Sequence, residues 1–173
     1  MKGIRIHEAA EKDALIFARV LCESWKAAYA DIITPTEMAK NTDAEKRAAF
    51  FETLIKSSQR NFYIAFDGTV SCGVCSISAS RDSDLQNYGE IVALYTLAEY
   101  WGRGVGQLLM QRGLAELKAR NFDHIMLWTF EKNTRARRFY ERNGFVFDGT
   151  YKDSGFANPL QTREVRYCLQ MKK

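Results

Sequence analysis

The chain has 173 residues, of which 46% are hydrophobic and 27% charged, the composition of an ordinary globular protein with one core. Its net charge of +4, from 25 basic and 21 acidic residues, is too small to indicate nucleic-acid binding. No apolar run approaches the roughly 18 residues of a membrane-spanning helix, and residues 1–14 are too charged for a signal peptide. We therefore expect one cytoplasmic domain over residues 1–173, with neither nucleic acid nor a membrane as partner.

The first third of the chain predicts one strand and two helices. Residues 4–9 predict the strand. The two helices are expected over residues 11–29 and 42–56, and residues 31–36 are expected to separate them.

A β-hairpin follows. Two strand-like runs, FYIAF and TVSCGVCSIS, flank the dipeptide Asp67-Gly68, which is typical of a type I′ turn. Cys72 and Cys75 have C-x-x-C spacing inside the second run, but no second pair with zinc spacing accompanies them. We expect no metal site and four reduced thiols.

The middle of the chain predicts a strand–helix–strand unit. Residues 90–97 (EIVALYTL) are almost all apolar, as in a strand buried on both faces. A helix is expected over residues 105–120 and a second buried strand over residues 124–130. Strands joined in this way are parallel and form a right-handed crossover.

The last third predicts a short helix over residues 134–143, with Asn133 as its N-cap and Gly144 as its stop. Two further strands, FVFDGTY and REVRYCLQM, close the chain. Five basic residues lie between Lys132 and Arg142, which indicates either a solvated helix face or a nearby anion site.

Three glycines (Gly102, Gly104 and Gly106) lie between the buried strand and the helix that follows it. The first turn of a helix has unpaired N–H groups and a positive dipole end, and glycine lets an anion approach them. Arg103 adds a positive charge. The segment lacks the Lys-Ser or Lys-Thr of a P-loop and the third small residue of a dinucleotide fingerprint. Taken alone, it indicates either a phosphate site or only a tight turn.

Two motifs together resemble the GNAT superfamily of N-acetyltransferases. The segment WGRGVG is similar to the family's [Q/R]-x-x-G-x-[G/A] turn, with Trp101 in the Gln/Arg position. The preceding LYTLAEY is similar to the family's approach to that turn, and residues 133–145 contain N-x-x-A-x-x-x-Y-E-x-x-G-F. The resemblance implies an α/β fold with a mixed, mostly antiparallel central sheet of about six to seven strands. About four helices would flank the sheet, with a parallel βαβ unit at the cofactor site.

The resemblance also implies an acetyl-CoA-dependent N-acetyltransferase. In such enzymes the glycine turn binds the pyrophosphate, and backbone N–H groups of the preceding strand bind the pantetheine. Tyr140 matches the tyrosine that protonates the leaving sulfur, although its place on the apolar side of its helix also suits a core aromatic. Asn133 matches a cofactor contact and could equally be only an N-cap. The cofactor-binding residues implied in this way are Tyr95, Thr96, Leu97, Gly102, Arg103, Gly104, Val105, Gly106, Gln107, Asn133 and Tyr140.

The acceptor side is less defined. Glu90 is a candidate general base, or else an exposed carboxylate at a strand end. Trp25 and Tyr29, four residues apart on a helix, are candidates for binding the acceptor, or else for core packing. The acceptor is expected to be a small-molecule amine or a peptide N-terminus. The alternatives are a silent acetyl-CoA-binding sensor or subunit and a protein for another phosphate ligand; the oligomeric state stays open, a homodimer included.

Overall fold

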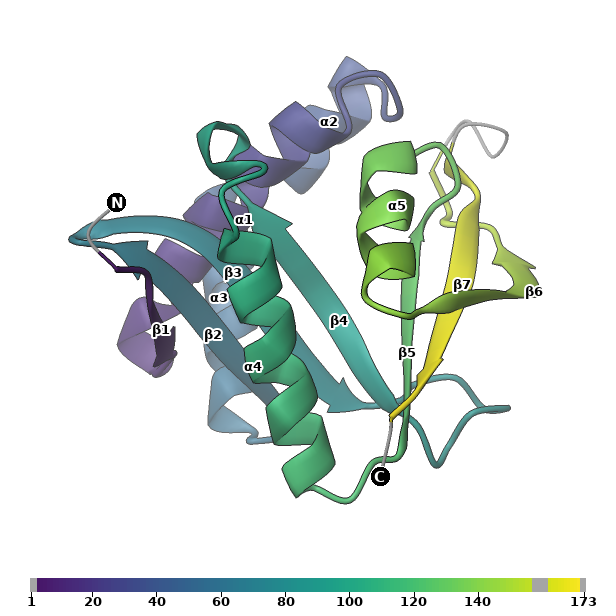
Figure 1. Cartoon of the computed structure of the whole chain (residues 1–173). Coiled ribbons are helices and arrows are strands. Elements are labelled where there is room, and N and C mark those ends of the chain that lie inside the picture. Colours follow the sequence, from purple (N-terminus) through teal and green to yellow (C-terminus); the bar gives the residue numbers. More distant parts are fainter. Residues whose placement is uncertain (1–2, 157–161, 172–173) are drawn as a thin grey trace.

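One seven-stranded sheet forms the centre of the molecule (Figure 1). The computed structural model describes residues 3–156 and 162–171. The strand order is β1-β2-β3-β4-β5-β7-β6, and β4–β5 is the parallel pair in an otherwise antiparallel sheet. The expected mixed sheet with a parallel βαβ unit is confirmed. The strands are β1 (Arg5–Glu8), β2 (Arg60–Asp67), β3 (Val70–Ala79), β4 (Gly89–Thr96), β5 (His124–Phe130), β6 (Val146–Lys152) and β7 (Glu164–Gln170).

Helices cover both faces of this sheet. On one face Phe62 and Ile64 of β2 pack with Phe17, and on the other face Tyr63 packs with the residues of the helix that follows β4. This alternation reflects the two-residue period of a strand. The five helices in the described part of the chain are α1 (Ala14–Ala28), α2 (Pro35–Asn41), α3 (Ala44–Lys56), α4 (Val105–Ala119) and α5 (Thr134–Arg142), with short 3-10 turns at Glu11–Asp13 and Ala98–Tyr100. None of them is long and apolar enough to cross a membrane.

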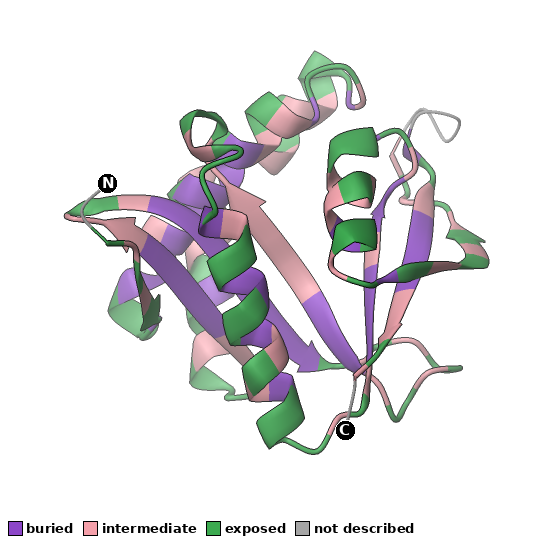
Figure 2. Ribbon diagram, viewed as in Figure 1, coloured by how far each residue is buried: buried purple, intermediate pink, exposed green. Residues whose placement is uncertain are grey.

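β4 and β5 separate after a short contact. Their parallel pairing joins only Gly89 to Ile125 and Glu90 to Met126, and the two strands then diverge (Figure 1). The sequence predicts that residues 90–97 are buried on both faces, but only the beginning of β4 is buried, and residues 92–96 are half-exposed (Figure 2). Their apolar side chains line an opening between the strands, which is why the prediction of full burial is wrong here.

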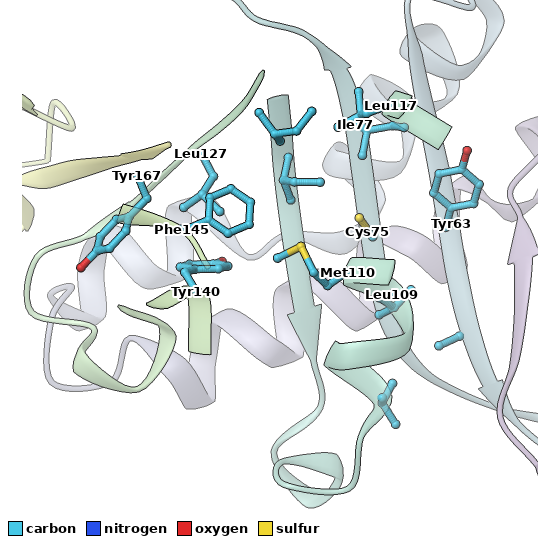
Figure 3. Packing of buried hydrophobic residues seen from close by; sticks show 14 of the residues in the cluster. Tyr63, Cys75, Ile77, Leu109, Met110, Leu117, Leu127, Tyr140, Phe145 and Tyr167 are labelled. Carbon is cyan, nitrogen blue, oxygen red and sulfur yellow. The ribbon is translucent and has the colours of Figure 1, made fainter. Parts of the chain in front are cut away.

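α4 packs closely on the sheet because a glycine lies on each side of the contact, Gly113 on α4 and Gly73 on β3. A Cβ at Gly113 of α4 would lie 3.1 Å from Ile91 Cδ1, and one at Gly73 of β3 would lie 2.9 Å from Leu109 Cδ1. Leu109 and Met110 are fully buried at this contact (Figure 3). The close packing fixes the N-terminus of α4 at the wide end of the opening between β4 and β5.

Two local predictions are wrong. α2 was not expected, because residues 31–36 read as a break; in fact the Thr34 hydroxyl accepts a hydrogen bond from the N–H of Glu37, and Pro35 occupies the first turn, where proline is tolerated. The hairpin pairs Asp67 with Val70, so Gly68 and Thr69 form its turn, and only Gly68 has a positive φ, 62°. That pattern is the one of a type II′ turn and not of type I′.

Candidate functional site

The opening between β4 and β5 is a cleft of about 280 Å³. Its walls come from α1, β4, the glycine turn, β5 and α5. The expected cofactor-binding residues that line it are Tyr95, Thr96, Gly102, Gly104, Gly106, Gln107, Asn133 and Tyr140. Beyond Glu90, the β5-facing edge of β4 has no strand partner among the described residues, so backbone groups on this edge face the cleft.

The glycine turn forms one end of the cleft. Gly102 and Gly104 have φ angles of 72° and 83°, in the left-handed region, and a Cβ built on either would meet no protein atom within 4 Å. Gly104 also precedes α4 as a cap without a side chain, so the N–H groups of the first helical turn have no capping partner. The open space beside unpaired N–H groups at a helix N-terminus fits a phosphate.

The basic run on α5 divides into two kinds of residue. Arg135 and Arg142 line the cleft. Arg137 instead donates to the Tyr167 hydroxyl at 2.9 Å and to the Glu131 carbonyl at 3.2 Å, which ties α5 to β7 and to the end of β5. Arg137 therefore fits neither interpretation of the run, and an anion site at Arg135 and Arg142 stays a prediction.

Tyr140 is a core aromatic that also lies on the wall of the cleft. Its ring packs at 6.1 Å from the Phe145 ring and 6.4 Å from the Tyr167 ring, and the residue is 7% exposed (Figure 3). It also lines the cleft, and no described residue hydrogen-bonds to its hydroxyl. Burial raises the pKa of this hydroxyl well above its usual value, so Tyr140 keeps its proton at neutral pH.

Three expected cofactor residues lie outside the cleft lining. The N–H of Leu97 donates to the Cys72 carbonyl at 3.1 Å, so this donor is already used. Val105 is fully buried in the core. Arg103 points its guanidinium toward the ring of Tyr100, 5.7 Å from the ring centroid. Asn133 does line the cleft, while its Oδ1 accepts from the N–H of Ala136 at 3.2 Å as an N-cap.

A second cavity, of about 250 Å³, adjoins the cleft. It holds the expected acceptor-side residues Trp25, Tyr29 and Glu90. Glu90 is 2% exposed, and Arg81 donates to it from the backbone at 3.2 Å and from the guanidinium at 3.0 and 2.5 Å. The alternative of an exposed carboxylate at a strand end is therefore wrong, because Arg81 from the loop that precedes β4 covers Glu90.

Several further residues line the cleft and the second cavity. Trp128 and Thr129 line both spaces, although the run over residues 124–130 read only as a buried strand. Ser24 is 1% exposed and lines the cleft, and no described residue pairs with its hydroxyl. Glu164 lines the second cavity from β7. The sequence gives no signal for Ser24, which stands between Glu23 and Lys26 in a mixed stretch of the helix, and none for Glu164.

Comparison with known proteins identifies the family. Residues 25–145 match the model of the acetyltransferase (GNAT) family. An uncharacterized N-acetyltransferase of Mycobacterium tuberculosis is 30% identical over 139 residues, which cover 80% of this chain and 86% of that protein. The chain therefore belongs to the GNAT family of acetyltransferases, and the expected family and enzyme class are confirmed.

Solved structures share the fold. A PaiA N-acetyltransferase of Thermoplasma acidophilum, solved in complex with coenzyme A, superposes with a TM-score of 0.77 at 20% identity over 97% of this chain and 99% of that one. An acetyltransferase of Salmonella typhimurium, solved with acetyl-CoA, superposes with a TM-score of 0.75 at 15% identity. The match covers 99% of this chain and 95% of that one. At these identities the likeness concerns the fold.

Proposed function

We propose that this protein transfers an acetyl group from acetyl-CoA to a primary amine by direct attack, with Tyr140 as the general acid. The observation that carries the proposal is the Tyr140 hydroxyl. It is protonated, has no partner among the described residues, and lies on the wall of a cleft that ends in an open glycine turn. Membership of the GNAT family and the coenzyme A complexes of its structural neighbours support acetyl-CoA as the co-substrate.

The residues of the cleft would divide the work of binding. The N–H groups at Gly104 and Gly106 would hold the pyrophosphate, with Arg135 and Arg142 adding positive charge at the rim. The unpaired edge of β4 at Tyr95 would hydrogen-bond the pantetheine. When bound, acetyl-CoA supplies the acetyl thioester.

Two groups would handle protons. The Tyr140 hydroxyl would donate its proton to the departing sulfur, because a positioned acid that stays protonated at neutral pH suits this step. Glu90 remains our candidate for taking the proton of the amine. It lines the adjoining cavity, but its carboxylate would first have to weaken its contacts with Arg81.

The test is a transfer assay with the full chain. Acetyl-CoA is incubated with a panel of primary amines, free CoA is measured with a thiol reagent, and the acetylated amine is identified by mass spectrometry. We expect CoA release that depends on the amine. Tight binding of acetyl-CoA without release on any amine would overturn the proposal and favour a sensor.

A further inference from the structure

The second cavity has walls built mainly from aromatic rings. Tyr29 lies with its ring centroid 4.8 Å from that of Phe130, and its hydroxyl lies 3.1 Å from the Tyr95 hydroxyl. Trp25 contacts the rings of Tyr29 and Phe156, at 5.3 and 6.5 Å. The aromatic residues that line the cavity are Trp25, Tyr29, Tyr95, Trp128, Phe130 and Phe156. Such walls favour a flat apolar body and also attract a cation over their faces.

Four charged residues line the same cavity and form two ion pairs, a tight one between Arg81 and Glu90 and a looser one between Lys152 and Glu164. The Arg81 guanidinium donates to both carboxylate oxygens of Glu90, at 3.0 Å or less, and its positive charge balances the charge of that carboxylate. Glu164 is bound more loosely: in the described part of the chain its ion pair is with Lys152, at 3.4 Å. The Lys152 ammonium also lies 4.1 Å from the centroid of the Trp128 ring. This cation–π contact competes with Glu164 for the ammonium group. Glu164 is therefore the under-neutralised carboxylate of the cavity.

The surroundings of Glu164 favour an added cation. Its side chain is 23% exposed. Burial raises its pKa; the charge of Glu90 acts in the same direction, while Lys152 and Arg81 lower it. An ammonium group placed beside Glu164 would offset the cost of keeping this carboxylate ionised in a partly buried site.

We propose that the second cavity binds the acceptor, and that the acceptor is a primary amine with one positive charge and an aromatic or bulky apolar body, its ammonium group at Glu164. The proposal rests on the proposed function, which places an amine beside the cleft. The two spaces adjoin, since both are lined by Tyr29, Val92, Tyr95, Trp128 and Thr129.

The same contacts disfavour two other classes of amine. An amino acid would bring a carboxylate, but both cations of the cavity, Arg81 and Lys152, already pair with carboxylates. A polyamine would bring further ammonium groups, and the single loosely paired carboxylate of the cavity, Glu164, can receive only one of them. A monoamine meets neither penalty.

Three probes, one from each class of amine, separate these classes. 2-Phenylethylamine, phenylalanine and 1,4-diaminobutane are titrated by calorimetry into the full chain saturated with CoA. We expect 2-phenylethylamine to bind about tenfold or more tightly than either of the others, because each of the others brings a further charge that the cavity must desolvate without a free partner. Equal or tighter binding of phenylalanine or the diamine would overturn the inference.

Three variants connect the preference to Glu164. Glu164→Gln should weaken 2-phenylethylamine binding about tenfold. Lys152→Gln should strengthen it, because it removes the competing cation. Glu131→Gln is the matched control, a carboxylate paired with Arg163 that lines neither space, and should leave binding unchanged. Thermal unfolding checks that each variant is folded.

The outcomes distinguish this inference from the proposed function. Unchanged binding in the Glu164→Gln variant, together with acetyl transfer, overturns the inference and leaves the function standing. Glu164-dependent binding of the amine without CoA release supports the acceptor site and overturns acetyl transfer as the activity.

Discussion

The guanidinium of Arg135 stacks on the indole of Trp101, 3.0 Å from the ring centroid. Trp101 belongs to the turn before α4 and Arg135 to the first turn of α5, so the contact joins the two sides of the cleft. The indole N–H also donates to the Thr96 carbonyl at 3.0 Å. Tryptophan thus replaces the Gln/Arg of the family motif with a side chain that holds an arginine at the cleft.

Arg135→Gln should lower the affinity for CoA and flatten its dependence on salt. An arginine–phosphate contact is screened by added ions, so its loss removes part of the salt effect. Trp101→Leu should give a smaller loss, about two- to fivefold, since a cation–π contact at an exposed site is worth about 0.5–1 kcal/mol. Calorimetric titration at low and high salt measures both. Arg138→Gln is the control on the same helix, exposed and outside the cleft, and a similar effect of both arginines would contradict the prediction.

Gly104→Ala should weaken acetyl-CoA binding by more than its loss of folding stability explains. At a φ of 83° an alanine is strained by roughly 1–2 kcal/mol, and its Cβ would occupy the open space that we assign to phosphate. Gly149→Ala is the matched control, because Gly149 has a φ of 90° and equally open surroundings but lies on β6, away from the cleft. Thermal unfolding with and without acetyl-CoA compares them; the stabilisation by the ligand should survive only in the control.

Local patterns in the sequence predict most of the fold. The apolar runs that become β4 and β5, the turn residue Gly68 and the cap Asn133 act through neighbours in the chain, so their signals are readable. α2 was missed because a proline favours both a break and a helix start.

The acceptor side could not be predicted in the same way. Glu90 and Arg81 are nine residues apart, and no periodicity shows that the loop between them folds back. Tyr29 and Tyr95, 66 residues apart, meet only after α1 has packed on the sheet. The separation of β4 and β5, which creates the cleft, has no signal in the apolar run of either strand.

Arg166→Leu should destabilise the protein by about 3 kcal/mol. Arg166 of β7 is 7% exposed and pairs with Asp82, Asp84 and Asp148, at 3.1, 2.9 and 2.6 Å, so its removal leaves carboxylates without a counter-charge. Asp82 also accepts the indole N–H of Trp128 at 3.0 Å, which connects this cluster to the cleft. Urea unfolding measures the loss. Arg163→Leu breaks the more exposed pair with Glu131 and should cost no more than about 1 kcal/mol; equal losses would contradict the prediction.

Glu164 should make stability depend on pH in a definite direction. Its folded-state pKa is raised above 4.5 by burial, so the folded protein binds this proton more tightly than the unfolded chain. The stabilisation is complete below the unfolded pKa and is lost as the pH rises through the folded pKa. Lys152 and Arg81 act against this shift and Glu90 with it. Urea unfolding at several pH values should show the wild type losing stability relative to Glu164→Gln as the pH rises, and a constant difference would contradict it.

Tyr140→Phe should reduce kcat by about 10²–10⁴-fold while leaving KM for acetyl-CoA nearly unchanged. The variant keeps the ring that packs on Phe145 and Tyr167, so the fold and the cleft are preserved, and only the proton donor is lost. Because burial raises the pKa of Tyr140 far above neutral, the wild type should show no loss of this acid between neutral and moderately alkaline pH. The measurement is steady-state CoA release with an accepted amine, wild type against variant, across that range. Retention of more than about a third of kcat, with chemistry limiting the rate, would leave Tyr140 as a core aromatic and move the acid to another residue.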